Sequence, residues 1–300
     1  MIRIGNATLE AVVEQDDLGF AFAQMQGGVD PAVLAPYLDW LAPDHWNPAT
    51  QTIRLSHHAW VVKTPGGIVL VDPCVGNGRD RPLTPFYHQL DTPFLERLAA
   101  IGVRPEDVDF VVCTHLHVDH VGWNTQLRDG RWVPTFPNAR YIFSRREHDY
   151  WARDLAGGLP KAVAFNSGVF ADSVKPVVDA GLALLVDEAA GYRFAGESFS
   201  LLPTPGHTIG SMSALLDGDD DGALFCGDVM HWPAQIVFPD WASNSSHDDA
   251  RAIASRRQVL ELCADRGLLL APQHFRGAHA CRIERTPAGF APRWSADGLL

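Results

Sequence analysis

Three histidines and one aspartate fall within the seven residues Thr114-His115-Leu116-His117-Val118-Asp119-His120. They follow the apolar run Val108–Cys113, which predicts a strand buried on both faces. His115 and His117 are two residues apart, so in extended backbone their side chains point the same way. Zinc readily accepts imidazole nitrogen and carboxylate oxygen, and one shared carboxylate suits two neighbouring divalent ions. The spacing therefore predicts a metal site rather than a His-rich loop with satisfied hydrogen bonds.

The His-x-His-x-Asp-His pattern resembles the hallmark of the metallo-β-lactamase fold superfamily of hydrolases. The resemblance implies an α/β fold, a four-layer αβ/βα sandwich with the metals along the edge between two sheets. It also implies three more ligands downstream, each at a strand end. Segments that match them are Thr204–Thr208 with His207, Phe225–Asp228 with Asp228, and Ala271–His274 with His274.

Carried over to this sequence, the resemblance implies two divalent ions, Zn²⁺ first, with manganese, cobalt and iron also possible. One ion would be held by His115, His117 and His207. The other would be held by Asp119, His120 and His274, with Asp228 bridging. Asp72 matches an aspartate that is usually structural. A hydroxide between the metals would attack the substrate, and Asp119 could take up the proton as the intermediate collapses; Asp119 and Asp228 are the expected catalytic carboxylates.

Departures from related subfamilies narrow the expected activity. Asp228 argues against antibiotic hydrolysis, and His117 stands where flavodiiron oxygen reductases carry glutamate. The length and the N-terminal half look most like quorum-quenching lactonases and methyl-parathion-hydrolase-like enzymes. We therefore expect hydrolysis of a small ester-like substrate, with a lactone favoured. Alternatives are an organophosphate or aryl-ester hydrolase on the same site, a mononuclear iron sulfur dioxygenase using two histidines and one aspartate, and a non-enzymatic binding module.

Residues beside the motifs are candidates for a substrate pocket. His231 lies three residues after Asp228, Phe275 is next to His274, and Trp123 follows the first motif. Packing in a loop or core is the competing interpretation for each. His57 and His58 are neighbours in an expected strand, so at most one of them faces the site.

The elements that must position these residues follow from periodicity and turn signals. Expected strands, besides Val108–Cys113, are Thr52–Lys63, Ile68–Asp72, Tyr141–Ser144, Ser198–Leu202, Ser213–Leu216, Ala223–Cys226 and Leu268–Ala271. Expected helices are Thr92–Ile101, Glu147–Leu155 and Asp248–Arg266. We expect one domain over residues 1–300, with an N-terminal extension or pocket cover at 1–50, a core at 52–276 and a C-terminal tail at 277–300. Residues 20–50, 157–175 and 230–247 are expected to shape the pocket.

The amino-acid composition argues against nucleic acid and membranes as binding partners. The chain has 24 Lys and Arg against 36 Asp and Glu, and a net charge of −12 repels nucleic acid. The first residues lack the apolar segment of a secretory signal, and no apolar run is long enough to span a membrane. The five cysteines are read as mostly buried thiols in a reducing cytoplasm. A small-molecule substrate is expected, and aromatic residues at 36–46, if exposed, hint at a homodimer.

Overall fold

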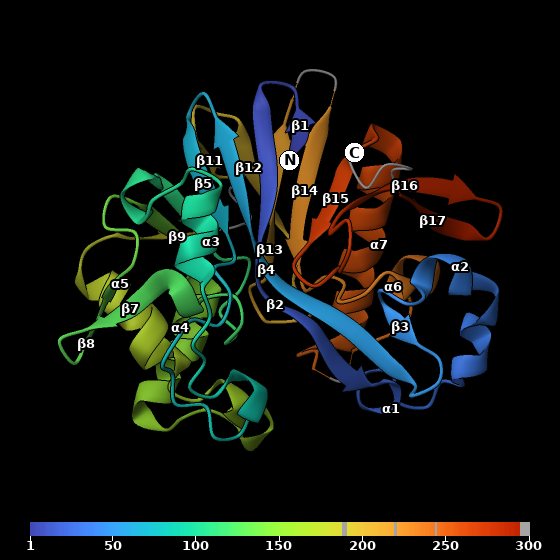
Figure 1. Ribbon diagram of the computed structural model, residues 1–300, viewed down its shortest axis with the longest axis horizontal. Helices are drawn as coiled ribbons and strands as arrows, with labels where there is room; N and C mark the ends of the chain where they lie inside the picture. Colours follow the sequence, from blue (N-terminus) through green and yellow to red (C-terminus); the bar gives the residue numbers. More distant parts are fainter. Residues whose placement is uncertain (188–190, 219–220, 244, 295–300) are drawn as a thin grey trace.

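The computed structural model describes residues 1–294 except 188–190, 219–220 and 244. Two large sheets pack against each other, and helices cover their outer faces (Figure 1). The first sheet has the order β1-β2-β4-β5-β6-β9-β10, with β3 paired to β4. Its strands are β1 (Ile2–Ile4), β2 (Ala7–Ala21), β3 (Trp46–Asn47), β4 (Thr52–Thr64), β5 (Gly67–Val71), β6 (Phe110–Val112), β9 (Arg140–Ser144) and β10 (Ala183–Val186).

The second sheet runs in sequence order from β11 to β17. It consists of β11 (Arg193–Phe194), β12 (Phe199–Pro203), β13 (Met212–Asp217), β14 (Gly222–Gly227), β15 (Leu269–Pro272), β16 (Cys281–Thr286) and β17 (Gly289–Arg293). A separate hairpin joins β7 (Thr125–Arg128) and β8 (Arg131–Pro134). Residues 277–300 were expected to be a tail. That expectation is wrong for 281–293, because Cys281 and Arg282 pair with β15 and extend the sheet.

Helices lie on the two outer faces, as the sandwich requires. They are α1 (Phe22–Met25), α2 (Leu38–Leu41), α3 (Phe94–Ala100), α4 (Arg145–Trp151), α5 (Lys175–Asp179), α6 (Ala234–Val237) and α7 (Asp249–Arg266). Helix α7 begins where the Asp248 carboxylate accepts the Arg251 N–H, and it ends at Gly267 in the left-handed conformation. In Figure 1, α3, α4 and α5 lie on one side of the sheets and α7 on the other. The predicted four-layer arrangement is confirmed.

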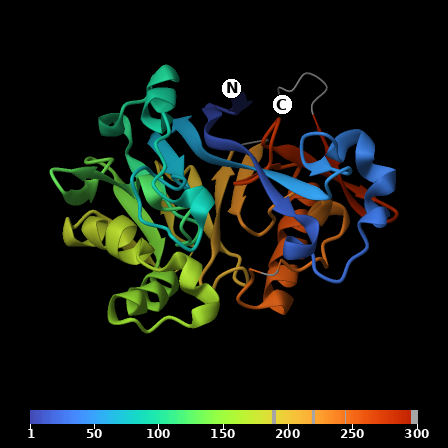
Figure 2. The same cartoon turned by 60° about the horizontal axis from the view of Figure 1, so that its bottom comes forward.

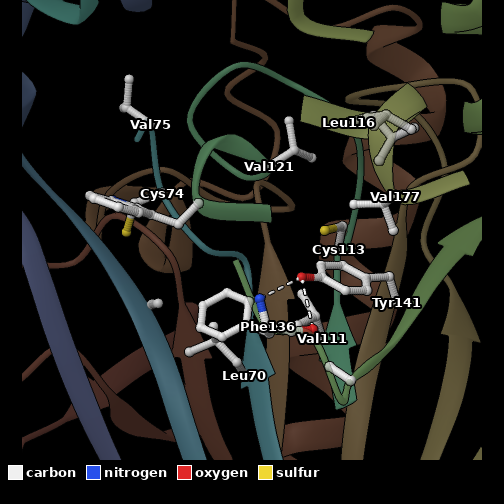
Figure 3. Packing of buried hydrophobic residues seen from close by; sticks show 14 of the residues in the cluster. Leu70, Cys74, Val75, Val111, Cys113, Leu116, Val121, Phe136, Tyr141 and Val177 are labelled. Carbon is white, nitrogen blue, oxygen red and sulfur yellow. Dashed lines mark hydrogen bonds between the residues drawn. The ribbon is translucent and has the colours of Figure 1, made fainter. Parts of the chain in front are cut away.

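Three apolar clusters hold these layers together. The middle cluster joins the facing sides of the two sheets through residues such as Trp60, Val112 and Phe225. A second cluster fills the space between the first sheet and its helices, and a third lies between the second sheet and α7. Figure 3 shows the second cluster around Leu70, Val111 and Tyr141, whose hydroxyl accepts the Phe136 N–H at 3.0 Å. Burial of this apolar surface is the main term stabilising the fold.

The N-terminal region, expected to be an extension or pocket cover over residues 1–50, is in part integral to the core, because β1 and β2 are strands of the first sheet. β2 pairs with β4 along most of its length, and the chain then passes through α1 into the short turns of residues 31–41. Phe22, Leu41 and Trp46 are buried there against Trp232. Tyr37 and Trp40 pack against the same cluster, so the aromatics in 36–46 are not the exposed surface on which the expectation of a homodimer rested. No helix among the described residues is both long enough and apolar enough to cross a membrane.

Candidate metal centre

The loop after β6 carries the first four site residues. Asp72, at the end of β5, holds this loop through its carboxylate, which accepts the Thr114 N–H and the Thr114 hydroxyl, both at 2.7 Å. The Thr114 hydroxyl in turn lies 3.2 Å from Nδ1 of His115. Asp72 also lies 3.0 Å from Nδ1 of His120. One buried carboxylate therefore orients the loop and two of its histidines.

The second sheet supplies the other three residues from the ends of its strands. His207 follows β12, Asp228 follows β14 and His274 follows β15. Gly227 has φ of +50°, and a Cβ atom on it would lie 2.2 Å from the Thr114 hydroxyl oxygen. Only glycine permits this close approach of the β14 end to the β6 loop. His274 is held by its Nδ1, which lies 3.0 Å from the Ser56 carbonyl oxygen.

Asp228 lies at the centre of the site. Its Oδ2 is 3.2 Å from Nε2 of both His207 and His231. Its Oδ1 is 3.2 Å from Nε2 of His120 and 3.0 Å from Nε2 of His274. The seven predicted residues thus converge. Six of them form two groups that share Asp228, while Asp119 belongs to a third group with His57 and His274. One group is His115, His117, His207 and Asp228; the other is His120, Asp228 and His274; within each, the ligand atoms lie within 4.8 Å of one another.

The donor set fits divalent cations. Nε2 of His115 is buried without a hydrogen-bond partner among the described residues, and the 3.2 Å approach of Nε2 of His120 to Oδ1 of Asp228 lacks good hydrogen-bond geometry. Such orphaned polar atoms are costly unless something binds them. Burial lowers the pKa of His115 and His207 far below the ordinary value and that of His117 to about 4, so these imidazoles are neutral. Neutral imidazole is the form that binds a metal.

The two carboxylates are also in the ligand form. Burial alone would raise the pKa of Asp119 and of Asp228, but neighbouring histidines, His120 foremost, hold both below the ordinary range. Burial alone would likewise lower the pKa of His120 and His274. The charge of Asp228 outweighs it and raises both. A cation that binds these two imidazoles must therefore displace protons.

Two residues that the sequence did not assign reach the site. His57 in β4 places Nε2 3.0 Å from Oδ2 of Asp119, whereas His58 turns away and lies 3.2 Å from the Pro272 carbonyl oxygen. Strand alternation indicates that only one of this pair faces the site, but not which one. Tyr87 in the turn Pro85–Tyr87 places its hydroxyl 2.7 Å from Nε2 of His57. The Tyr87 segment has no motif from which its position could be inferred.

An open cavity of about 450 Å³ leads to the centre. Its floor includes His57, His117, Asp119, His207, Asp228 and His274. Its walls come from α4, from Thr84, Phe86 and Tyr87, and from parts of the three expected segments 20–50, 157–175 and 230–247. These parts are Phe20, Gln24 and Met25; Val163 and Phe165; and His231, Ser243 and Ser245–His247. Figure 2 shows α1 (blue) and the segment that follows α4 (yellow-green) on different sides of this end of the molecule.

Of the three candidate pocket residues, only His231 lines the cavity. Trp123 does not: its ring stacks on Phe94, and its indole N–H donates to Glu14 at 2.6 Å in the core. Phe275 is fully buried under α7, because consecutive residues of an extended chain point to opposite sides and His274 takes the cavity side. The expectation that Trp123 and Phe275 line the pocket is wrong.

Histidines and aspartates gathered at the strand ends of a two-sheet sandwich identify the protein as a metal-dependent hydrolase of this fold. Residues 52–274 match the metallo-beta-lactamase superfamily, and the chain belongs to it. The chain is 38% identical over 180 residues to the N-acyl homoserine lactonase AttM of Azorhizobium caulinodans, covering 57% of this chain and 60% of that one. It spans about 58–60% of the length of the first curated relatives it matches.

Solved structures share the fold at low identity. The hydrolase AbOPH superimposes with a TM-score of 0.79 at 21% identity, covering 97% of this chain and 94% of that chain. AidC, described as a dizinc quorum-quenching lactonase in complex with a product, superimposes with a TM-score of 0.73 at 20% identity, covering 98% and 96%.

Proposed function

We propose that this metal-dependent hydrolase binds two zinc ions and hydrolyses small lactones. The observation that carries the two-ion assignment is Asp228, whose two oxygens face two different groups of histidines. One ion is assigned to His115, His117 and His207, the other to Asp119, His120 and His274, with Asp228 between them. An iron dioxygenase site would use only two histidines and one aspartate, so the additional converging donors favour two ions.

The chain's own residues have distinct roles in this proposal. When bound, two such ions supply an activated water at neutral pH and polarise the substrate carbonyl. Asp119, at the cavity floor, is placed to hand a proton to the departing oxygen. His231 lies in the wall beside Asp228 and can donate to a substrate oxygen. Opening of the lactone ring by one water gives a hydroxyl and a carboxylate: one proton of the water goes to the departing oxygen, and the other is released to solvent.

The cavity favours a neutral substrate. Its described lining residues include Phe20, Met25, Leu55, Phe86 and Phe165 but no lysine or arginine. A phosphate monoester or other anion would find no side-chain cation on the walls, and the charge of −12 opposes its approach. A lactone with an apolar substituent suits such walls. The 38% identity to a lactonase over part of the chain supports this substrate class.

The aromatic walls also suit an aryl group. Phe20, Phe86, Tyr150, Trp151 and Phe165 all line the cavity, and offset or edge-on ring contacts would hold an aryl ester or an aryl phosphotriester. This second candidate uses the same metal centre.

A substrate panel on the zinc-loaded protein separates the two candidates. We expect kcat/KM for a γ-lactone with an acyl side chain to exceed that for an aryl acetate or an aryl phosphotriester at least tenfold. The chelated protein and Asp228→Asn serve as controls, and both are expected to lose at least 1000-fold. Hydrolysis of phosphotriesters without lactones would overturn the lactone assignment. An Asp228→Asn variant with full metal content and unchanged rate would overturn the role of Asp228.

The compartment proposed is the cytoplasm. All five cysteines are unpaired and buried, which is typical of a protein kept in a reducing environment.

A further inference from the structure

The side of Asp119 that faces away from His120 carries a small hydrogen-bonded group. Nε2 of His57 lies 3.0 Å from Oδ2 of Asp119, and the Tyr87 hydroxyl donates to the same oxygen at 3.1 Å. The Tyr87 hydroxyl and Nε2 of His57 are themselves 2.7 Å apart. All three side chains line the cavity, and His57 and Tyr87 are buried. Nothing in the two-ion scheme uses His57 or Tyr87.

The contacts of His57 differ from those of the assigned ligand His274, although His57, Asp119 and His274 form a group whose ligand atoms lie within 4.8 Å of one another. A ligating histidine directs one nitrogen at the ion and donates its other N–H to the protein. His274 follows this rule, with Nδ1 3.0 Å from the Ser56 carbonyl oxygen and Nε2 directed at Asp228. His57 shows the reverse: its Nδ1 is buried without a partner among the described residues, and its Nε2 is engaged by Tyr87 and Asp119.

These contacts fix the protonation of His57. An orphaned N–H is worse than an orphaned lone pair, so the single ring proton belongs on Nε2, where Oδ2 of Asp119 and the Tyr87 hydroxyl oxygen share it. The hydroxyl hydrogen of Tyr87 also points to Asp119. Two donors therefore contact Oδ2, which also lies 3.6 Å from Nε2 of His274, while Oδ1 accepts neither of them and lies 3.9 Å from Nε2 of His120.

We propose that His57 and Tyr87 are positioning residues that lock the Asp119 carboxylate, holding Oδ2 by two hydrogen bonds so that Oδ1 is the oxygen offered to the metal. This inference rests on the proposed two-ion centre. Partners that orient a ligand in this way typically contribute 10–100-fold to metal affinity. Removal of either donor should weaken one metal equivalent and spare the other, because Asp119 is assigned to one ion only.

The test uses variants that differ in a single donor. Tyr87→Phe removes one oxygen, His57→Leu removes the ring donor, and His57→Gln keeps an amide N–H able to reach Asp119. Tyr37→Phe and His58→Gln are matched controls outside the cavity. Zinc affinities of both equivalents are measured by competition with a chromophoric chelator, without any substrate. The visible spectrum of the cobalt-loaded protein reports the coordination geometry.

We expect Tyr87→Phe and His57→Leu to weaken the binding of one of the two zinc ions about 10–100-fold. In the cobalt-loaded protein, only the absorption bands of one of the two ions should change. His57→Gln should recover part of the loss, and the controls should stay within twofold of wild type. The double variant should lose less than the product of the single losses, since both act on one oxygen.

Unchanged affinities for both equivalents in Tyr87→Phe and His57→Leu would overturn the inference. So would loss of a whole equivalent in both His57 variants with Tyr87→Phe at wild-type affinity, because His57 would then be a ligand. If His57→Leu does not fold, Tyr87→Phe decides alone. A wild-type stoichiometry below two would instead contradict the proposed two-ion centre itself, so the two failures are distinguishable.

Discussion

His231 is the cavity residue nearest to the shared carboxylate that is not in either proposed ligand set. Its Nε2 lies 3.2 Å from Oδ2 of Asp228, and its ring stacks parallel to that of His274 at 5.8 Å. A donor at this place can steady negative charge on the substrate oxygen, and loss of one such donor typically costs about 100-fold.

We therefore predict that His231→Phe lowers kcat for lactone hydrolysis by about 100-fold while metal content stays at the wild-type value. Steady-state kinetics and metal analysis on the same preparation check this. Loss of one metal equivalent in step with activity would contradict the assignment and make His231 a ligand. Leu55→Met, in the cavity wall, gives the effect of a change in wall shape alone.

A histidine far from the cavity predicts how stability varies with pH. His45 is buried between Phe275 and Trp294, and burial, followed by the charge of Arg276, lowers its pKa to about 3. The unfolded chain has an ordinary histidine pKa of about 6.5. As pH falls below that value the unfolded state takes up a proton that the folded state refuses, so stability falls.

His45 alone should cost about 2 kcal/mol of the free energy of unfolding between pH 7.5 and pH 5.0. His45→Phe keeps a flat ring at this position and should abolish that part of the pH dependence. Urea unfolding of both proteins at the two pH values measures the difference. An equal pH dependence in the two proteins would show that His45 is not held neutral.

At the scale of elements, α4 joins the two ligand-bearing loops. Glu147, in its first turn, is fully buried; its Oε2 accepts the Leu116 N–H at 3.2 Å and the Trp151 indole N–H at 2.7 Å. Its Oε1 accepts the Gly210 N–H at 2.7 Å. Leu116 lies between His115 and His117, and Gly210 lies just after His207. One side chain thus links the first-sheet loop to the second-sheet loop.

Glu147→Gln should weaken zinc binding about 10–100-fold and lower the free energy of unfolding by about 1–3 kcal/mol. The reason is that glutamine replaces one of the two carboxylate oxygens with an NH₂ group. That NH₂ group would face a backbone or indole N–H and could not accept its hydrogen bond. Chelator competition and denaturant unfolding provide the two measurements. Glu96→Gln, on the exposed side of α3, is the matched control, and a variant indistinguishable from it would refute the role of Glu147.

The elements that carry the ligands were predictable because they are continuous apolar runs ending in polar motifs. β6, β12, β14 and β15 all lie within one or two residues of their predicted bounds. β16 and β17 were missed because only two residues of β16 and none of β17 are fully buried, so too few apolar positions alternate to give a periodic signal. β7 and β8, which form an isolated hairpin, lack a pattern for the same reason.

The residues of the site also include some that could be predicted from the sequence and some that could not. Residues that belong to a spaced motif, such as His115 and Asp228, were assigned from sequence. His57 and Tyr87 act through contacts between segments 30 residues apart, with partners that no local pattern names. Trp123 and Phe275 were misplaced because nearness in sequence to a ligand does not fix the direction of a side chain.

At the scale of the whole molecule, the metal centre connects both sheets. The β6 loop belongs to the first sheet, and the strand ends that carry His207, Asp228 and His274 belong to the second. Bound ions would thus add cross-links that the unfolded chain lacks, and a ligand at 100 times its dissociation constant stabilises a protein by about 2.7 kcal/mol.

We predict that removal of metal by a chelator lowers the melting temperature by about 5 °C or more and that stoichiometric zinc restores it. Differential scanning calorimetry of the chelated and reloaded protein checks this, with calcium as the control ion because its hard oxygen preference fits the site poorly. Equal melting temperatures before and after chelation would show that bound metal does not stabilise the contact between the two sheets.

The cavity is assembled from two sources that are separate in the chain. All seven proposed ligands follow strands at fixed positions, whereas much of the wall comes from α1, the turn Pro85–Tyr87, Val163, Phe165, Ser243 and Ser245–His247. Wall residues such as Phe20 or Phe165 can therefore be exchanged while the strand ends stay in place. Natural or laboratory evolution can therefore change the substrate preference from one ester to another by substituting wall residues. The metal ligands, and with them the reaction, are left unchanged.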